Sequence, residues 1–439
     1  MARAKKEASL TPEERLQAAL VPDWEWPYKL PENWCWLKLV ESFDNHTDSK
    51  KKIKQKDYLV KGKLAVVDQG QELIGGYTND VEKSYSGALP IVIFGDHTRC
   101  IKFVDFPFAQ GADGVKVLRP KPFYLPKAFY YALQSVNIPN LGYRRHFPLF
   151  NKFSIPLPPF AEQQRIVDRI ESLFVKLDEA KEKAQAVVDS FEIRKAAILH
   201  KAFTGELTAK WREEHGVGME SWEQCSLSDV CTVNPKKVDT KDLPDELEVS
   251  FFPMPALSEI YGEITDPQTR LLKEVRSGFT NFSEGDVVFA KITPCMENGK
   301  SAVVGKLVND IGYGTTEFFV LRCSDRLYNR FLYHLVRDKL FRDKAKAVMA
   351  GAVGQQRVPK RYLETYKLNL PKFNEQREIV RILDGSFVKE QQSQEAAEAV
   401  LDQIDLMKKS ILARAFHGEL GTNDPSEESA MELLKRTIL

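Results

Sequence analysis

Two stretches of the chain carry apolar side chains in alternating steps of four and three residues, the spacing of a helix that buries one stripe. The first helix is expected from about residue 161 to 202, which is on the order of 60 Å at 1.5 Å per residue. A mean step of 3.5 residues is typical of a coiled coil. The stripe of this first helix consists of Ile166, Ile170, Leu173, Leu177, Ala180, Ala184, Val187 and Phe191.

The second helical stretch has a weaker stripe at its start, where Ser386, Glu390 and Ser393 stand at positions that should be apolar. An antiparallel pairing would set the apolar start of the first helix against the apolar end of the second. Two independent bundle helices are the alternative. The stripe of the second helix resumes at Ala397, Val400, Ile404, Met407 and Ile411.

Both helices belong to an internal repeat with an offset of 213 residues. Residues 155–207 and 368–420 align without a gap, and 23 of the 53 pairs are identical. The repeat contains "LPPFAEQQRIV" and "LPKFNEQREIV" at its start, and "AFTGEL" and "AFHGEL" at its end. Gly205 and Gly418 stand where a helix C-terminal cap is expected. Upstream of each copy, Trp34 and Trp222 lie five residues before a leucine, in "PENWCWLKL" and "MESWEQCSL".

The regions outside the repeats differ in length and cannot be aligned with each other. The chain therefore keeps the repeat segments constant and varies the bodies that they connect. Short strand-like runs predict a mixed α+β body in each region: "KLAVVDQGQ", "ALPIVIFG" and "CIKFVDF" in the first, "GDVVFAKI", "SAVVGKLV" and "TEFFVLRC" in the second. Each body then turns helical, in "YLPKAFYYALQ" and in "LYNRFLYHLVRDKLFRDKAKAVM". The predicted segments are an N-terminal extension (1–29), a first body (30–153), a first repeat (154–207), a linker (208–221), a second body (222–367), a second repeat (368–420) and a tail (421–439).

Composition narrows the class of protein. No apolar run approaches the roughly 18 residues of a membrane span, and the N-terminus has no apolar signal region. The six cysteines contain no CxxC pair, which favours reduced thiols in a cytoplasm over a disulfide framework or structural zinc. The net charge is only +1, but the first body has 18 Lys and Arg against 12 Asp and Glu. Positive charge is thus concentrated between the repeats, although an ordinary mixed surface would explain it equally well.

Polar and basic loops of the two bodies are the candidate DNA contacts. Lysines suit phosphates, and Arg, Gln, Asn and His can make directed hydrogen bonds to base edges. Each loop could instead be a solvated connection. At the offset of the repeat, Arg144 falls on Arg357. The candidates are Lys50, Lys51, Lys52, Gln69, Gln71, Arg144, Arg145 and His146 in the first body, and Lys291, Asn298, Lys300, Gln355, Gln356, Arg357, Lys360 and Arg361 in the second.

Catalytic signatures are missing. "ENGKS" ends like a phosphate-binding loop, but Pro294 occupies the position of its first glycine. Asn234-Pro235 is followed by lysines, whereas a DNA methyltransferase has Pro and an aromatic residue there. The histidines are dispersed and show no metal-ligand spacing. We therefore expect no catalytic residues, no metal site and no cofactor in this chain.

With its repeats, Trp motifs and variable bodies, the chain resembles a specificity subunit of a type I restriction–modification system. The run "EGDVVFAKITPCMENGKSAVV…GTTEFFVLR" looks like a typical target-recognition domain, and "IVIFGDHTRCIKFVDFPFAQGADGVKVL" looks like one of another class. The resemblance implies an α+β fold with two globular target-recognition domains, separated by two long antiparallel coiled-coil helices in a pseudo-twofold repeat.

The same resemblance implies a non-catalytic reader of double-stranded DNA in which each body recognises one half of an interrupted, asymmetric site. The helices, with Ile166, Ile170, Leu173, Leu177, Val187, Phe191, Val400, Ile404 and Ile411 in the seam, would dock two modification (methyltransferase) subunits. Those subunits would use S-adenosylmethionine, and restriction subunits would use ATP and Mg. A coiled-coil scaffold that presents two protein-binding domains is the alternative from another class.

Overall fold

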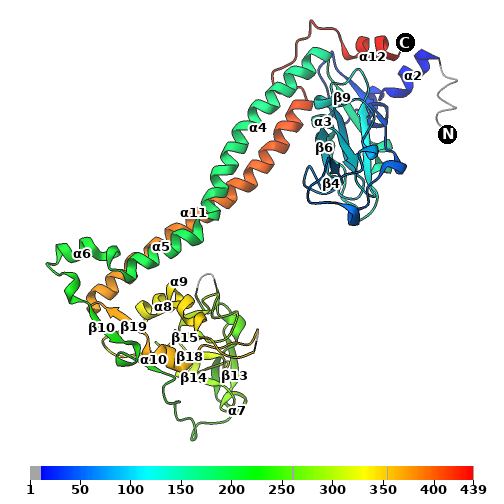
Figure 1. The fold of residues 1–439 in the computed structure, drawn as a ribbon. Helices are drawn as coiled ribbons and strands as arrows, with labels where there is room; N and C mark the ends of the chain where they lie inside the picture. Colours follow the sequence, from blue (N-terminus) through cyan, green and yellow to red (C-terminus); the bar gives the residue numbers. More distant parts are fainter. Residues whose placement is uncertain (1–10, 260–261, 353, 439) are drawn as a thin grey trace. The chain divides into compact units, whose positions relative to one another are not determined.

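The computed structural model describes residues 11–259, 262–352 and 354–438 (Figure 1). The chain forms two compact units. The first unit comprises the chain up to Ala184 and again from Ala399, and the second comprises Gln185–Glu398. Of the predicted N-terminal extension, residues 1–10 lie outside the described residues.

The first unit contains a four-stranded sheet in the order β2-β8-β5-β6 and a three-stranded sheet in the order β4-β3-β7. The predicted runs around Val66, Ile93 and Phe103 are strands, and the predicted helix is α3 (Pro126–Ser135). The strands are β1 (Cys35–Lys38), β2 (Phe43–Asn45), β3 (Leu64–Val67), β4 (Gly76–Thr78), β5 (Ile91–Gly95), β6 (Ile101–Val104), β7 (Phe108–Gln110), β8 (Val115–Pro120) and β9 (Ser154–Leu157).

The second unit contains two four-stranded sheets, β11-β18-β15-β16 and β13-β12-β17-β14. Its strands are β10 (Glu223–Ser226), β11 (Cys231–Val233), β12 (Glu248–Phe252), β13 (Gln268–Leu271), β14 (Thr280–Phe282), β15 (Val287–Ala290), β16 (Ser301–Val303), β17 (Gly312–Gly314), β18 (Phe318–Cys323) and β19 (Lys367–Leu370). Its shorter helices are α6 (Ala209–Glu214), α7 (Leu272–Val275), α8 (Asn329–Arg337), α9 (Lys339–Ala347) and α10 (Lys360–Thr365). The α+β prediction is therefore confirmed for both bodies.

A two-stranded antiparallel ladder connects each body to its long helix. In the first unit β1 pairs with β9, and in the second β10 pairs with β19. In both units the residue directly after the tryptophan faces the leucine of the Leu-Pro signature: Cys35 faces Leu157, and Glu223 faces Leu370. The Trp motif and the repeat signature thus form one structural joint, present twice with the same register.

A buried glutamate of the signature binds the tryptophan of the same unit. Trp34 donates from Nε1 to Glu162 at 2.7 Å, and Trp222 donates from Nε1 to Glu375 at 2.9 Å. The carboxylates are satisfied further by Thr422 and Asn423 in the first unit. In the second unit Glu375 accepts from Thr208 and from the buried guanidinium of Arg212, both at 2.7 Å.

The glutamine that follows fixes the body helix to the long helix. Gln163 accepts a hydrogen bond from the backbone N–H of Leu125, which caps α3, and donates to the carbonyls of Phe123 and Pro158. In the second unit Gln376 bonds the backbone at Tyr328, the cap of α8, in the same manner. The signature is repeated because each joint needs one buried carboxylate and one buried amide.

The repeat helices are α4 (Phe160–Asp189) and α5 (Phe191–Phe203) in the first copy and α11 (Phe373–Phe416) in the second. The single helix predicted over 161–202 is interrupted at Ser190, whose hydroxyl donates to the carbonyl of Ala186 and competes with the helical ladder. Gly205 and Gly418 follow the helix ends with φ of +83° and +77°, which confirms their capping role.

Within each unit the two helices run antiparallel. In the first unit Lys408 pairs with Asp178, and Lys181 pairs with Asp405. Residue numbers therefore increase along one helix while they decrease along the other. In the second unit Arg194 binds Glu390 at 2.6 Å. Glu390, which the sequence pattern treated as a defect of the stripe, therefore has a partner in the opposite helix.

The predicted stripe of α11 is partly wrong. Ile404 is buried and Ile411 half-buried, as expected, but Val400 and Met407 are exposed, whereas the neighbouring Leu401 and Lys408 are half-buried. The ammonium of Lys408 lies 5.0 Å from the ring centre of Phe174 and reaches Asp178, so its aliphatic stem fills the stripe while its charge stays solvated. The predicted stripe of α4 and α5 is confirmed: Ile166, Ile170 and Phe191 are buried, and Leu173, Leu177 and Val187 are half-buried.

Both ends of the chain complete the first unit. Helix α12 (Ala430–Ile438) lies beside α2 (Pro12–Ala19) (Figure 1), and the Ala430 N–H donates to the carbonyl of Asn33. Arg165 on α4 forms a bidentate pair with Glu427. Leu16 of the predicted N-terminal extension and Leu433 and Leu434 of the predicted tail are buried in the same hydrophobic core of the first unit.

We expect Glu375→Gln to destabilise the protein by about 3 kcal/mol, because it leaves the buried Arg212 without its counter-charge. Glu162→Gln should cost only about 1 kcal/mol, because the donors that reach Glu162 are neutral and an amide can still pair with them. The measurement is denaturant unfolding of the full chain, followed by the fluorescence of the joint tryptophans. Equal losses in the two variants would contradict the distinction.

Candidate nucleic-acid interface

Three loops of the first unit meet in one polar cluster: 69–71, 97–100 and 141–145. The side-chain oxygen of Gln69 accepts from the His97 N–H at 3.1 Å, and its backbone carbonyl accepts from the Thr98 hydroxyl at 2.6 Å. His97 Nδ1 is 3.2 Å from the carbonyl of Tyr143. Gln71 accepts a weak bond from the Cys100 thiol at 3.9 Å. The candidates Gln69 and Gln71 therefore lie beside the loop that carries Arg144 and Arg145. We call these three loops the recognition loops of the first unit.

Arg144 and Arg145 are exposed, and within the described ranges no acid pairs with either guanidinium. Two unpaired arginines on one loop can bind phosphates or the acceptor edge of guanine. His146 differs from them because it is fully buried. Its Nδ1 donates to the Asp96 carbonyl and its Nε2 accepts from the Leu141 N–H, so the imidazole holds the loop and does not face solvent.

Of the three candidate lysines Lys50, Lys51 and Lys52, two have a partner among the described residues. Lys51 donates to the carbonyl of Ser84, and Lys52 lies 3.7 Å from Asp113. Lys50 is exposed in the middle of a short helical turn, Ser49–Lys51, that Asp48 caps. A solvated loop with one exposed lysine suits phosphate contact better than base recognition.

In the second unit, residues 292–300 lie beside residues 354–357, which belong to the two polar segments that contain the candidates Asn298, Gln355 and Arg357. Ile292 and Arg357 form a β-bridge, and the Thr293 N–H donates to the Gln356 carbonyl at 3.0 Å. Asn298 and Gln355 are exposed, and Gln356 is half-buried. We call this pair the recognition loops of the second unit.

Arg357 is clamped, in contrast to Arg144. Its Nε and Nη2 donate to the two carboxylate oxygens of Glu317 at 2.9 Å each, and Nη1 donates to the Gln355 carbonyl. The hydrogen bonds from Arg357 hold the pKa of Glu317 below its usual range. Arg357 therefore fixes its own segment beside Glu317, which directly precedes β18. Among the predicted base contacts of these loops, the amides of Gln355 and Asn298 are the exposed side chains that no such clamp holds.

The remaining candidates of the second body are basic residues around these loops. Lys291 lies over the ring of Phe319, and Lys300 is held by the Met254 carbonyl and by Glu259 at 3.6 Å. Lys360 pairs with Glu364 one turn along α10. Arg361 is exposed on the same helix. Lys360 and Arg361, at the start of α10, are the remaining exposed basic candidates beside these loops.

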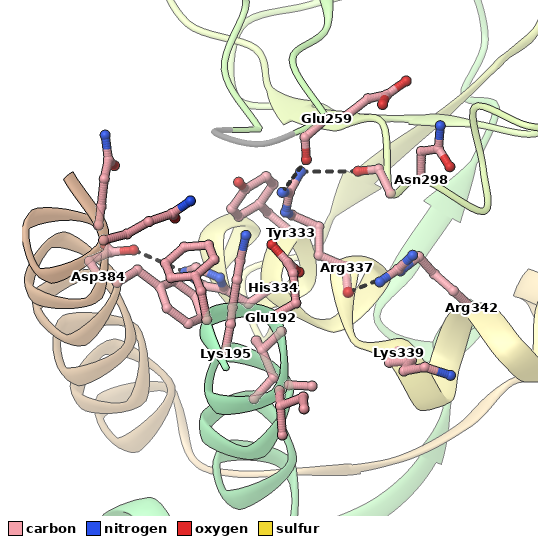
Figure 2. Close-up of a pocket in the computed structure, with 18 of the residues that line it drawn as sticks. Glu192, Lys195, Glu259, Asn298, Tyr333, His334, Arg337, Lys339, Arg342 and Asp384 are labelled. Atoms are coloured by element: carbon pink, nitrogen blue, oxygen red, sulfur yellow. Dashed lines mark hydrogen bonds and ion pairs between the residues drawn. The ribbon is translucent and has the colours of Figure 1, made fainter. Parts of the chain in front are cut away.

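A cavity of about 1170 Å³ lies in the second unit between α5 and α11 on one side and α8 and α9 on the other (Figure 2). His334 is buried there and bonds Asp384 at 3.0 Å. Burial lowers the pKa of His334, so its imidazole is neutral near pH 7. Burial and then the charges of Arg337 and Arg342 lower the pKa of Lys195. Sequence reasoning missed this cavity because helices far apart in the chain line it.

No group of three or more His, Cys, Asp or Glu side chains in the described part of the chain is arranged to hold a metal ion. None of the helices that the structure describes has the length and apolarity needed to cross a membrane.

The protein is a duplicated α+β protein. The same joint and long helix occur twice, and each copy carries a body of different construction with its own cluster of polar loops. Residues 31–188 and 219–398 each match the family described as type I restriction modification DNA specificity domain. The chain belongs to that family, because the two matches together cover most of its length.

Relatives of known name support the family. The chain is 32% identical over 259 residues to the specificity subunit of the type I restriction enzyme EcoEI of Escherichia coli, an alignment that covers 49% of this chain and 43% of that protein. The EcoAI specificity subunit of the same species is also 32% identical, with 44% of its length covered. The chain thus spans less than half the length of these relatives.

Solved structures share the fold. The HsdS subunit from Thermoanaerobacter tengcongensis gives a TM-score of 0.54 at 20% identity, covering 90% of this chain and 100% of that one. A chain from a structure of the type I R-M system, reported for complex assembly and conformational transition, gives 0.62 at 18% identity, with the same coverage.

We expect Glu317→Gln to loosen the recognition loops of the second unit, because a neutral amide cannot accept both hydrogen bonds from Arg357. The measurement is hydrogen exchange at the Arg357 and Val358 amides, which bond the carbonyls of Ala350 and Lys291. Glu364→Gln, which removes only a surface pair with Lys360, is the matched control. Unchanged exchange in Glu317→Gln would show that the clamp does not hold the loop.

Proposed function

We propose that this protein is the DNA-recognition subunit of a type I restriction–modification complex and that its two bodies read the two halves of an interrupted, asymmetric site. The observation that carries the proposal is the duplicated joint, which holds two bodies of different construction by the same Glu–Trp and Gln–cap contacts. Equivalent mounting with different loops suits two half-sites of different sequence.

The chemistry of the complex would reside in its partners. This chain lacks the sequence motifs that bind S-adenosylmethionine or nucleotide phosphates. Modification subunits would supply methyl transfer with S-adenosylmethionine, and restriction subunits would supply cleavage driven by ATP and Mg. The role of this chain is to place those subunits on a chosen sequence, so it is not itself an enzyme.

Two modification subunits are favoured by a repeated pair of exposed apolar side chains on the helices. Val175 and Val388 are equivalent at the repeat offset and are 58% and 55% exposed. Ile193 and Leu406 are equivalent too, at 72% and 63%. The first unit carries Val175 and Leu406, and the second carries Ile193 and Val388, which both line the cavity of Figure 2. Each unit would dock one copy of the same partner through its pair.

The competing function is a scaffold that presents two protein-binding domains. The unpaired Arg144 and Arg145, the exposed Lys50, and the exposed Lys360 and Arg361 favour nucleic acid. Neutralising phosphates releases counterions, so DNA binding must weaken steeply as salt rises, which a protein–protein scaffold does not require.

The purified chain should neither methylate nor cut DNA, and methyl transfer to duplex DNA should appear once it is co-purified with its modification subunit. Binding of that complex to a mixed genomic duplex should fall by orders of magnitude between 50 and 200 mM salt if several phosphates are contacted, as expected on the order of 10³ or more. Methyl transfer by the isolated chain, or salt-independent binding, would refute the proposal.

Ile193→Asp and Leu406→Asp should each remove one copy of the modification subunit, because a charge replaces an apolar contact. Mass photometry of the co-purified complex should count two copies for the unchanged chain, one for each single variant and none for the double variant. Val60→Asp is the control, because Val60 is 91% exposed on a loop of the first body. A double variant that keeps two copies would show that the contact lies elsewhere.

A further inference from the structure

The recognition loops of the first unit contain an aromatic pair, Tyr143 and His97, that is not among the candidate residues named from the sequence. The ring of Tyr143 stacks on the ring of His97 with centroids 4.8 Å apart and planes 14° from parallel. Tyr143 is nevertheless 86% exposed. A tyrosine this exposed contributes little to the stability of its own fold, so its presence in this loop needs another reason.

Several contacts hold the pair rigid. His97 Nδ1 bonds the carbonyl of Tyr143, and the His97 N–H bonds the side chain of Gln69. The backbone of Gly114 packs so closely that an added Cβ would lie 2.5 Å from Gln69 Oε1 and 2.8 Å from the His97 ring. Gly142, with φ of +66°, makes the turn that brings Tyr143 back over His97. The tyrosine is thus pre-organised, with its outer face free.

The neighbours of the pair are suited to duplex DNA. Arg144 and Arg145 follow Tyr143 directly and have no acidic partner in the described part of the chain. A loop that carries an exposed aromatic ring and two exposed guanidiniums combines a surface for apolar base contact with groups for phosphates or guanine. A tyrosine also keeps its hydroxyl for a base edge.

We propose that Tyr143 is a specificity-determining residue of the first unit, which contacts a base of one half-site, and that His97 is the positioning residue that holds its ring. This inference rests on the proposed DNA-recognition function. It assigns base discrimination in that half-site to an aromatic contact beside the arginines.

The test uses the full complex with its modification subunit and a pool of randomised duplex DNA, from which bound sequences are selected and sequenced. Tyr143→Ala should lose preference at one or two base positions of a single half-site, by about tenfold, while the other half-site keeps its sequence. Trp24→Ala is the matched control, because Trp24 is 84% exposed in the same unit. Its selected sequence should not change.

His97→Ala should weaken the same positions as Tyr143→Ala, and His97→Phe, which keeps a ring under Tyr143, should restore them. An unchanged selected sequence for Tyr143→Ala, or equal erosion of both half-sites, would overturn the assignment. Failure of the proposed function looks different, because the unchanged complex would then select no sequence at all. Melting temperatures of all variants show that each chain is folded.

Discussion

The buried hydrogen bond between a glutamate and a tryptophan is the constraint on which both units depend. A carboxylate removed from water must be fully paired, and a tryptophan N–H can satisfy only part of it. Each unit therefore gathers further donors around Glu162 or Glu375, from segments distant in sequence. That requirement brings the strand after the tryptophan, the start of the long helix and the segment after the Gly-Glu-Leu turn to one point. The position of the body on the helix follows from it.

The frame stays constant while the loops that it carries differ in electrostatics as well as in shape. Arg144 and Arg357 are separated by the repeat offset of 213 residues, yet Arg357 donates to Glu317, whereas Arg144 has no acidic partner among the residues that the structure describes. The same residue type thus fastens a loop in one unit and is exposed without an acidic partner among the described residues in the other. A duplicated gene product can change its recognition surface in this way without altering the joint below it, since the clamp acid lies in the body and not in the repeat.

The repeat, the caps at Gly205 and Gly418 and the predicted strands could be read from the sequence, because they depend on local spacing and backbone conformation. The stripe of α11 could be read only in part. A rule based on apolar residues selects Val400 and Met407, which are exposed. The aliphatic stem of Lys408 packs there instead, because its ammonium can pair with Asp178. The clamp on Arg357, the burial of His146 and the pairing of His97 with Tyr143 depend on contacts across 40 residues or more, which no local pattern reports.

The division of the first unit between the two ends of the chain has a consequence for biosynthesis. The second unit is continuous, so all of its residues emerge from the ribosome together and can close around Glu375 while translation proceeds. Glu162 binds Thr422 and Asn423, and α2 packs with α12, so the first unit can close only after these late segments have been made. The usual order, in which the N-terminal part folds first during synthesis, is therefore reversed. The first unit, which begins to be made first, is completed last. A ribosome that stalls before residue 422 therefore releases a chain in which the second unit is complete and the first unit lacks the donors of Glu162.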